Sequence, residues 1–151
     1  MSQRGDAIDL DTSLGYLLKE ASTALRQSME AVLRPLGMTV THYSCLELLA
    51  QRPGLSNSEL ARGAFVTRQS MNVLLQSLER DGDVVRPPDA AVGKVLPAQL
   101  TARGRRKLAA ATAAVRSVEV RMTDGLSEAE RAAALTILRR MVDSLRDEGP
   151  A

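Results

Sequence analysis

The fold is decided by the stretch LSNSELARGAFVTRQSMNVLLQSLERDGDVVRP, Leu55 to Pro87. Its pattern changes twice: a short helix pattern ends at a break, a longer helix pattern follows, and β-forming residues come last. Ser56 and Glu59 form a capping box, in which each side chain satisfies a backbone donor of the other residue. A short helix is therefore predicted from about Asn57 to Arg62, with RGAF as the break after it.

The second helix of this stretch is predicted to be polar along one whole side. Thr67 is its expected N-cap, and Asp81 and Gly82 end it. Its aliphatic stripe consists of Met71, Leu74, Leu75 and Leu78. The opposite side carries Arg68, Gln69, Asn72, Val73 and Gln76. Side chains such as Arg, Gln and Asn bind phosphates and read base edges, which favours a nucleic-acid partner over an ordinary solvated face.

Two β-prone segments follow, Val84 to Arg86 and 95–100, and they predict a small hairpin rather than a sheet domain. The loop between them contains Pro87, Pro88 and Gly93. Pro97 has no N–H for a sheet ladder, so we expect it on the open side of an edge strand.

Four more helices are predicted around this central stretch. The first begins within 11–13 and ends at the RPLG turn, and the second runs from about Thr39 to the RPG turn. After the hairpin, Thr101 caps a long helix, and Ser127 with Glu130 forms a capping box for the last one. The first helix and the last two carry aliphatic stripes without a large core of their own, so we expect them to pack against a second copy.

The composition is that of a globular protein. The 151 residues are 44% hydrophobic and 25% charged, with 2% aromatic residues and no Trp, which suits a single domain with an aliphatic core. No apolar run approaches the ~18 residues of a membrane span, and the N-terminus has no signal-peptide pattern. We therefore expect a soluble, cytoplasmic protein that binds no membrane.

The net charge of +2 is unevenly distributed along the chain. Residues 62–107 carry nine Lys or Arg and four Asp or Glu residues, a net charge of +5, while the flanking segments are mildly acidic. A basic middle of this kind favours a polyanionic partner, although a charge run is more often a solvated face.

The single cysteine and the single histidine offer little for catalysis. Cys45 lies in the apolar run YSCLELL, which indicates burial rather than reactivity. One histidine, His42, excludes a multi-histidine metal site, and we predict no metal site and no cofactor. His42 and Cys45 are three residues apart, a spacing that permits a nucleophile–base pair, but no Asp or Asn to orient the base is evident. We therefore do not expect an enzyme.

The whole order of elements resembles the MarR family of winged helix-turn-helix transcriptional regulators. The likeness rests on GMTVTHYSCLELLAQRPGLSNSELARGAFVTRQSMNVLLQSLERDGDVVRP and on LTARGRRKL after the hairpin. The family typically has an LA pair in the short helix, an arginine near the start of the recognition helix, LE with a glycine at its end, and LT with a glycine after the wing. The likeness extends from about Leu14 to about Leu145. It implies a mainly α fold with a small β-hairpin wing and with dimerisation helices at both ends of the chain.

The likeness also implies which segments bind DNA, which form the dimer, and which residues contact DNA. Residues 39–100 would form the DNA-binding region of one domain, 1–151, and residues 11–37 and 101–147 its dimerisation helices. The helix after Thr67 would enter the major groove. The implied DNA-binding residues are Ser56, Ser58, Arg62, Thr67, Arg68, Gln69, Ser70, Asn72, Gln76, Arg86 and Lys94.

Two positions depart from the family pattern. The family wing usually carries Asp-x-Arg, whose arginine reaches the minor groove, whereas this chain has Val92 and Lys94 around Gly93. Lysine binds phosphate as a point charge and lacks the planar fork of arginine. The second departure is Val73, where family members often carry a polar or basic residue.

Family members are homodimers that bind pseudo-palindromic double-stranded operators, and many are repressors released by a small aromatic or phenolic acid. By this likeness, the residues expected near a ligand are Tyr16, Leu17, His42, Tyr43 and Leu46, all of which also suit an ordinary core. The family's peroxide sensors use a cysteine near the start of the first helix, which this chain lacks. The remaining alternative is a winged-helix module that acts through protein partners with weak or no DNA binding.

Overall fold

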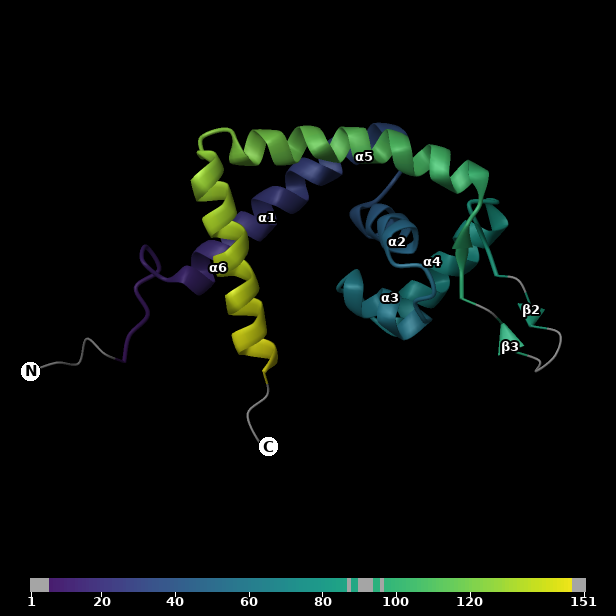
Figure 1. Cartoon of the computed structure of the whole chain (residues 1–151), viewed down its shortest axis with the longest axis horizontal. Coiled ribbons are helices and arrows are strands. Elements are labelled where there is room, and N and C mark those ends of the chain that lie inside the picture. Colours follow the sequence, from purple (N-terminus) through teal and green to yellow (C-terminus); the bar gives the residue numbers. More distant parts are fainter. Residues whose placement is uncertain (1–5, 87, 90–93, 96, 148–151) are drawn as a thin grey trace, which may run out of the picture. The chain divides into compact units, whose positions relative to one another are not determined.

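The computed structural model describes residues 6–86, 88–89, 94–95 and 97–147, and it is mainly helical (Figure 1). The helices in chain order are α1 (Leu14–Leu33), a 3-10 turn η1 (Arg34–Leu36), α2 (Val40–Gln51), α3 (Asn57–Gly63), α4 (Arg68–Arg80), α5 (Ala102–Thr123) and α6 (Glu128–Arg146). The chain divides into two compact units, Met1–Arg116 and Ser117–Ala151. Among the described residues, no helix has the length and apolar character needed to cross a membrane.

The helices begin where the sequence places their caps. Ser13, Thr39, Ser56, Thr67 and Ser127 each accept a hydrogen bond from the backbone N–H three residues later. Both predicted capping boxes are present, because Glu59 and Glu130 accept from the backbone N–H of their cap residues. Accepting these bonds lowers the pKa of the Glu59 and Glu130 carboxyls. Local side-chain chemistry therefore sets the helix boundaries.

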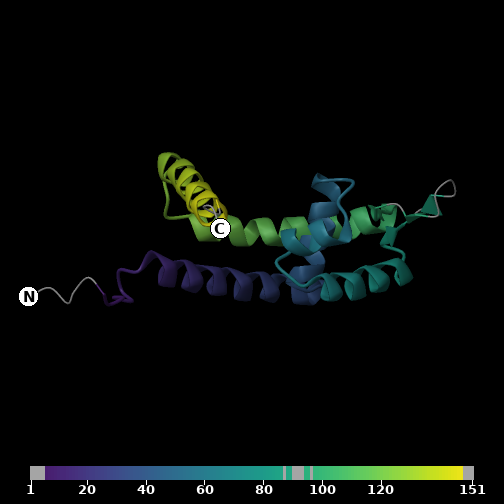
Figure 2. The same cartoon turned by 90° about the horizontal axis from the view of Figure 1, so that it is seen from below.

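The wing consists of two short antiparallel ladders instead of one hairpin with longer strands. β1 (Val84–Val85) pairs with β4 (Gln99–Leu100), and β2 (Pro88–Asp89) pairs with β3 (Lys94–Val95). The β2–β3 end lies away from α2 and α3 in Figure 1 and stays at the edge of its unit in Figure 2. The expectation of a small hairpin is confirmed, but the expectation of an edge strand through Pro97 is wrong. Pro97 lies between β3 and β4, because a residue without an N–H interrupts the ladder.

The core of the first unit is aliphatic, as the composition predicts. The α4 side chains Met71, Leu75 and Leu78 are buried, and Leu74 is partly buried beside them. Cys45 is fully buried in the same core, and burial raises the pKa of its thiol to about 12. A thiol with so high a pKa stays protonated near neutral pH, so Cys45 packs as a small apolar side chain.

A joint of Gly82, Asp83, Thr101, Gly104 and Lys107 connects the end of α4 to the start of α5. The Thr101 hydroxyl donates to the Gly82 carbonyl at 2.6 Å and accepts from the Gly104 N–H at 3.1 Å. The Thr101 N–H donates to the Asp83 carbonyl at 3.1 Å. Gly104 packs directly on this carbonyl, where a Cβ atom would collide with the oxygen. These contacts give a physical reason for the LTARG sequence after the wing.

Candidate nucleic-acid interface

Two hydrogen bonds between side chains fix α3 and α4 relative to each other. The Asn57 amide donates to Asn72 Oδ1 at 2.6 Å, and Arg68 Nε donates to the Ser58 hydroxyl at 2.8 Å. Each bond joins a residue in the first turn of α3 to a residue in the first half of α4. The two helices therefore form one preorganised helix-turn-helix. Within it, Asn72 Oδ1 and Arg68 Nε are already used in hydrogen bonds to α3.

The side of α4 opposite the core stripe is exposed. Gln69, Val73, Gln76 and Arg80 are spaced four, three and four residues apart, so they share one face of the helix. All four are exposed, whereas Met71, Leu75 and Leu78 on the opposite side are buried. The structure thus presents the predicted polar side of α4 outward within its own unit.

The other predicted DNA-binding residues of the helix-turn-helix surround this face. The Ser56 hydroxyl accepts from the Glu59 N–H at 3.2 Å, and the Thr67 hydroxyl donates to Ser70 Oγ at 2.9 Å. Ser58 is partly buried by its contact with α4. The predicted residues that are exposed here are Ser56, Arg62, Thr67, Arg68 and Ser70. The first turns of α3 and α4 therefore bring hydroxyl and guanidinium donors together.

The wing residues are placed differently from these helix residues. Arg86 Nε lies 2.9 Å from Glu79 Oε1, an ion pair without hydrogen-bond geometry, and 21% of the Arg86 side chain is exposed. This pair ties the wing to α4. Lys94 pairs with Asp89 in the β2–β3 ladder, while the Lys94 side chain and the residues Val92 and Gly93 lie outside the described part of the chain.

Phe65, in the turn between α3 and α4, is a residue that the sequence reasoning missed. Its φ of 60° lies in the left-handed region, which disfavours bulky side chains, and 85% of the residue is exposed. The turn is closed by the Val66 N–H, which donates to the Ala61 carbonyl at 3.0 Å. The break at RGAF was a signal for a turn, but it gave no indication of this backbone conformation.

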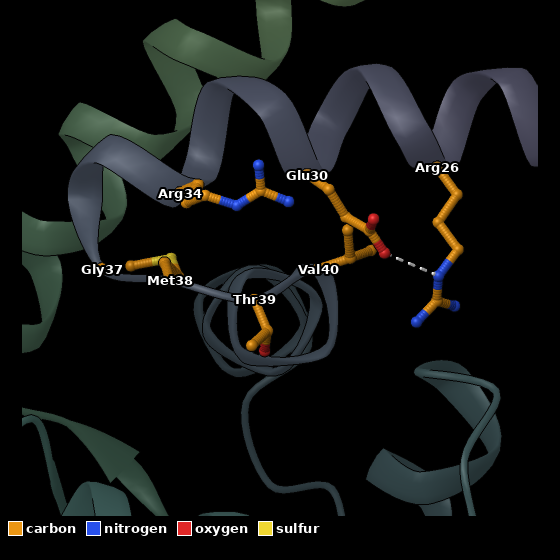
Figure 3. A pocket seen from close by; sticks show the side chains of 7 residues that line it. All are labelled: Arg26, Glu30, Arg34, Gly37, Met38, Thr39 and Val40. Atoms are coloured by element: carbon orange, nitrogen blue, oxygen red, sulfur yellow. Dashed lines mark hydrogen bonds and ion pairs between the residues drawn. The ribbon is translucent and has the colours of Figure 1, made fainter.

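An open concavity of about 370 Å³ lies between the end of α1 and the start of α2. Figure 3 shows Arg26 and Glu30 of α1, with Arg34 of η1 after them, facing the segment that opens α2. Arg26 Nε donates to Glu30 Oε1 at 3.1 Å. The other lining residues are Gly37, Met38, Thr39 and Val40. Two guanidinium groups and one carboxylate give this concavity a net positive lining.

The predicted ligand residues do not gather in this concavity. Tyr16 and Leu17 are exposed on α1, Leu46 is fully buried in the core, and His42 and Tyr43 are partly buried on α2. Tyr43 lines a second, open cavity of about 200 Å³ together with Ser44, Glu47, Leu48, Gln51, Arg52 and Gly63. Its hydroxyl donates to Glu47 Oε2 at 2.6 Å.

Glu47 connects α2 to α5 through the same carboxylate. Gln51 Nε2 donates to Oε1 at 2.8 Å, and the Thr112 hydroxyl donates to Oε2 at 3.1 Å. Burial alone would raise the pKa of Glu47, but the hydrogen bonds from Tyr43, Gln51 and Thr112 outweigh it and lower the pKa. The side chain therefore stays ionised near neutral pH.

His42 lies in an environment that disfavours its charged form. Its Nε2 is buried and has no hydrogen-bond partner among the described residues. Burial lowers the pKa of His42 from 6.5, and the Lys107 charge acts in the same direction, while Asp83 and Asp81 act against it. Among the described residues there is no cluster of three or more His, Cys, Asp or Glu side chains that could hold a metal ion.

Comparison with known proteins identifies relatives over most of the chain. The pattern described as MarR family matches residues 36–95. The HTH-type transcriptional repressor Rv2887 of Mycobacterium tuberculosis (strain H37Rv) is 48% identical over 112 residues, which are 74% of this chain and 81% of that protein. The family match includes the whole helix-turn-helix segment from Leu55 to Pro87.

Two solved structures of this relative bear on the fold and on its partners. Rv2887 in complex with salicylic acid has a TM-score of 0.74 and 42% identity, covering 86% of this chain and 96% of that one. Rv2887 in complex with DNA has a TM-score of 0.67 and 39% identity, covering 90% of this chain and 99% of that one. The predicted winged helix-turn-helix fold is confirmed by these likenesses together with the helices and strands described above.

Proposed function

Since the chain belongs to the MarR family of transcriptional regulators, which are non-enzymatic, we propose that it binds a pseudo-palindromic DNA operator as a homodimer and represses transcription. The observation that carries this proposal is the exposed face of α4. Its amide and guanidinium groups lie opposite a buried aliphatic stripe, on a helix that α3 holds in a fixed orientation. The Rv2887 complex with DNA supports the same partner.

We assign the contacts of this interface by their chemistry. Gln69 and Gln76 present amides that read base edges, and Asn72 retains its Nδ2 group as a donor beside them. The donors in the first turns of the two helices bind phosphates; they are Ser56, Ser58, Arg62, Thr67, Arg68 and Ser70. Lys94 of the wing binds phosphate, and Arg86 orients the wing through its ion pair with Glu79.

The homodimer is supported by apolar side chains that the chain leaves exposed. On α1 these include Leu14, Leu17 and Leu18, and on α6 they include Leu135, Leu138, Val142 and Leu145. A second copy would bury both sets, since exposed apolar patches of this kind mark interaction surfaces. Two copies would present their α4 helices about one turn of DNA apart, roughly 34 Å.

We further propose that a small aromatic or phenolic acid releases the operator. The Rv2887 complex with salicylic acid supports this ligand class. The concavity beside Arg34 suits an acid, because the Arg34 side chain makes no ion pair or hydrogen bond with the residues that the structure describes, and guanidinium groups bind carboxylates as a fork. The alternative site is the predicted group of Tyr16, Leu17, His42, Tyr43 and Leu46, of which Tyr43 reaches a cavity.

DNA binding is tested with a fluorescent duplex from the region upstream of the chain's own coding sequence. We expect nanomolar to micromolar affinity that falls steeply with salt, with a logarithmic slope of about 0.9 per phosphate contacted. Gln69→Ala should relax the preference at one base by ~1–3 kcal/mol. The matched control is Gln27→Ala, an exposed glutamine on α1, which should leave the affinity unchanged. If electrophoresis of the duplex with the protein shows no shifted complex at low salt, the alternative of a winged-helix module that acts through protein partners is favoured.

The ligand site is tested by the salicylate concentration that releases half of the bound duplex. Arg34→Ala should raise this concentration if the acid binds between α1 and α2, whereas Tyr43→Ala should raise it if the predicted group is used. Arg131→Ala, which removes an exposed guanidinium of α6, is the control. Release that neither Arg34→Ala nor Tyr43→Ala alters would overturn both placements.

A further inference from the structure

Val73 is an apolar side chain at the centre of the exposed face of α4. It is 61% exposed, although Met71 and Leu75 on either side of it in the sequence are fully buried. Gln69 precedes it by four residues and Gln76 follows it by three, so both glutamines flank Val73 on the same helix face. A valine there contributes nothing to the core of its own unit.

The chemistry of valine restricts what it can do at this place. It has no donor or acceptor for a phosphate or for a polar base edge, and its stiff branched side chain lowers helix propensity slightly. A polar residue would suit a merely solvated face better. An apolar contact is therefore the interaction that Val73 offers to a partner that α4 meets.

The major groove of DNA presents one apolar group that fits this description. Thymine carries a C5-methyl group at the groove edge, on the opposite side of its base pair from the adenine N6 and N7 atoms. Glutamine amides pair with adenine N6 and N7 through two hydrogen bonds. A row of glutamine, valine and glutamine thus matches consecutive A·T pairs better than G·C pairs.

We propose that Val73 packs against the C5-methyl group of a thymine in each half-site, and that it makes the operator preference A·T-rich at the centre of the α4 footprint. This inference rests on the proposed function, because it requires α4 to enter the major groove. It adds a specificity-determining residue to the polar contacts proposed above.

The test begins with duplexes selected by the full-length chain from a synthetic library randomised over about 20 base pairs, two turns of DNA. In a selected duplex, each thymine is replaced in turn by deoxyuridine, which removes only the C5-methyl group and keeps base pairing. The dissociation constant is measured by fluorescence anisotropy for the unmodified chain and for Val73→Ala. Alanine favours helix, so this exposed variant should fold, and circular dichroism verifies that it does.

We expect one thymine per half-site at which deoxyuridine weakens binding about fourfold, the worth of one buried methyl group. At that thymine, the same replacement should have no effect on Val73→Ala. The matched control is Val120→Ala, because Val120 is 63% exposed on α5 and lies opposite the stripe of Ala111, Val115 and Val118. This control should keep the full response to deoxyuridine.

Three results would separate the possible failures. If selected duplexes bind tightly but no thymine shows a response that Val73→Ala removes, the role of Val73 is overturned while the proposed function stands. If Val73→Ala and Val120→Ala lose the response equally, the methyl contact does not belong to Val73. If the library yields no bound duplex at low salt, both the proposed function and this inference are overturned.

Discussion

Lys107 Nζ lies 2.8 Å from Asp83 Oδ2, and Asp83 is completely buried. The other carboxylate oxygen accepts from Arg103 Nε at 3.2 Å. Asp83 lies in the turn after α4, and its two partners, Arg103 and Lys107, come from the first two turns of α5. A buried carboxylate needs these partners, since an unpaired charge in a protein interior is strongly destabilising.

Removing either cation should destabilise the chain, but unequally. Lys107→Met should lower the free energy of unfolding by about 1–3 kcal/mol, because Asp83 then keeps one partner only. Arg103→Met should cost less than about 1 kcal/mol, since the Arg103 side chain is 58% exposed against 37% for Lys107. Urea unfolding measures both, with the exposed Arg105→Met as control. Equal losses for Lys107→Met and Arg105→Met would contradict the role of the buried pair.

Gly104→Ala should destabilise the joint between α4 and α5 by about 1–3 kcal/mol, as overpacking does elsewhere. The added Cβ atom would collide with the Asp83 carbonyl oxygen, and a backbone atom cannot rotate away. Gly125→Ala is the comparison, because a Cβ atom there meets nothing nearby. Thermal unfolding followed by circular dichroism distinguishes the two variants. An unchanged midpoint for Gly104→Ala would show that α5 can shift without loss.

Phe65→Asn should raise the free energy of unfolding by about 1 kcal/mol, because asparagine tolerates the left-handed region better than a bulky aromatic residue. Phe65 is 85% exposed, so the substitution removes little packing. Chemical denaturation gives the magnitude. A loss of stability would mean that the exposed ring makes a contact in solution, for instance with a second copy, that offsets the strain.

His42 should make the stability of the chain fall as the pH decreases below neutrality. Burial lowers the pKa of His42 in the folded chain below 6.5, so the unfolded chain binds the proton first. Stability is therefore lost as the pH falls through 6.5 toward the folded pKa, and His42→Gln should lose less between about pH 7.5 and about pH 5.5. Urea unfolding at these two pH values measures the difference.

The same pKa is directly observable by NMR, because the chain has one histidine and therefore one pair of imidazole resonances. A midpoint at or above 6.5 would contradict the burial of Nε2. The low pKa of Glu47 does not interfere, since its carboxyl titrates below this pH window.

The helix boundaries could be predicted because their causes are local. Ser56 with Glu59, and Ser127 with Glu130, lie three residues apart, so the sequence displays each capping box directly. The stripe of α4 was equally readable, since burial repeats with the period of the helix. The same pattern also predicted which side of α4 is exposed, because the residues between the buried positions lie on the opposite side of the helix.

The misses arise from contacts between residues that are distant in sequence or from backbone geometry. No local pattern marks Asp83 as buried, because its cations follow 20 and 24 residues later. Phe65 has a positive φ without the glycine that usually reports one. The concavity beside Arg34 depends on how α1 meets α2, which periodicity alone does not specify.

The Asn57–Asn72 and Ser58–Arg68 hydrogen bonds have a consequence for re-engineering the operator preference. Transplanting α4 alone from a relative would discard one member of each bond, and the foreign helix would sit on α3 with unmatched donors. The smallest cassette that can be exchanged is therefore 56–80, both helices with their turn. Mutations that retarget the protein should arise in pairs across this seam, with one change in each helix.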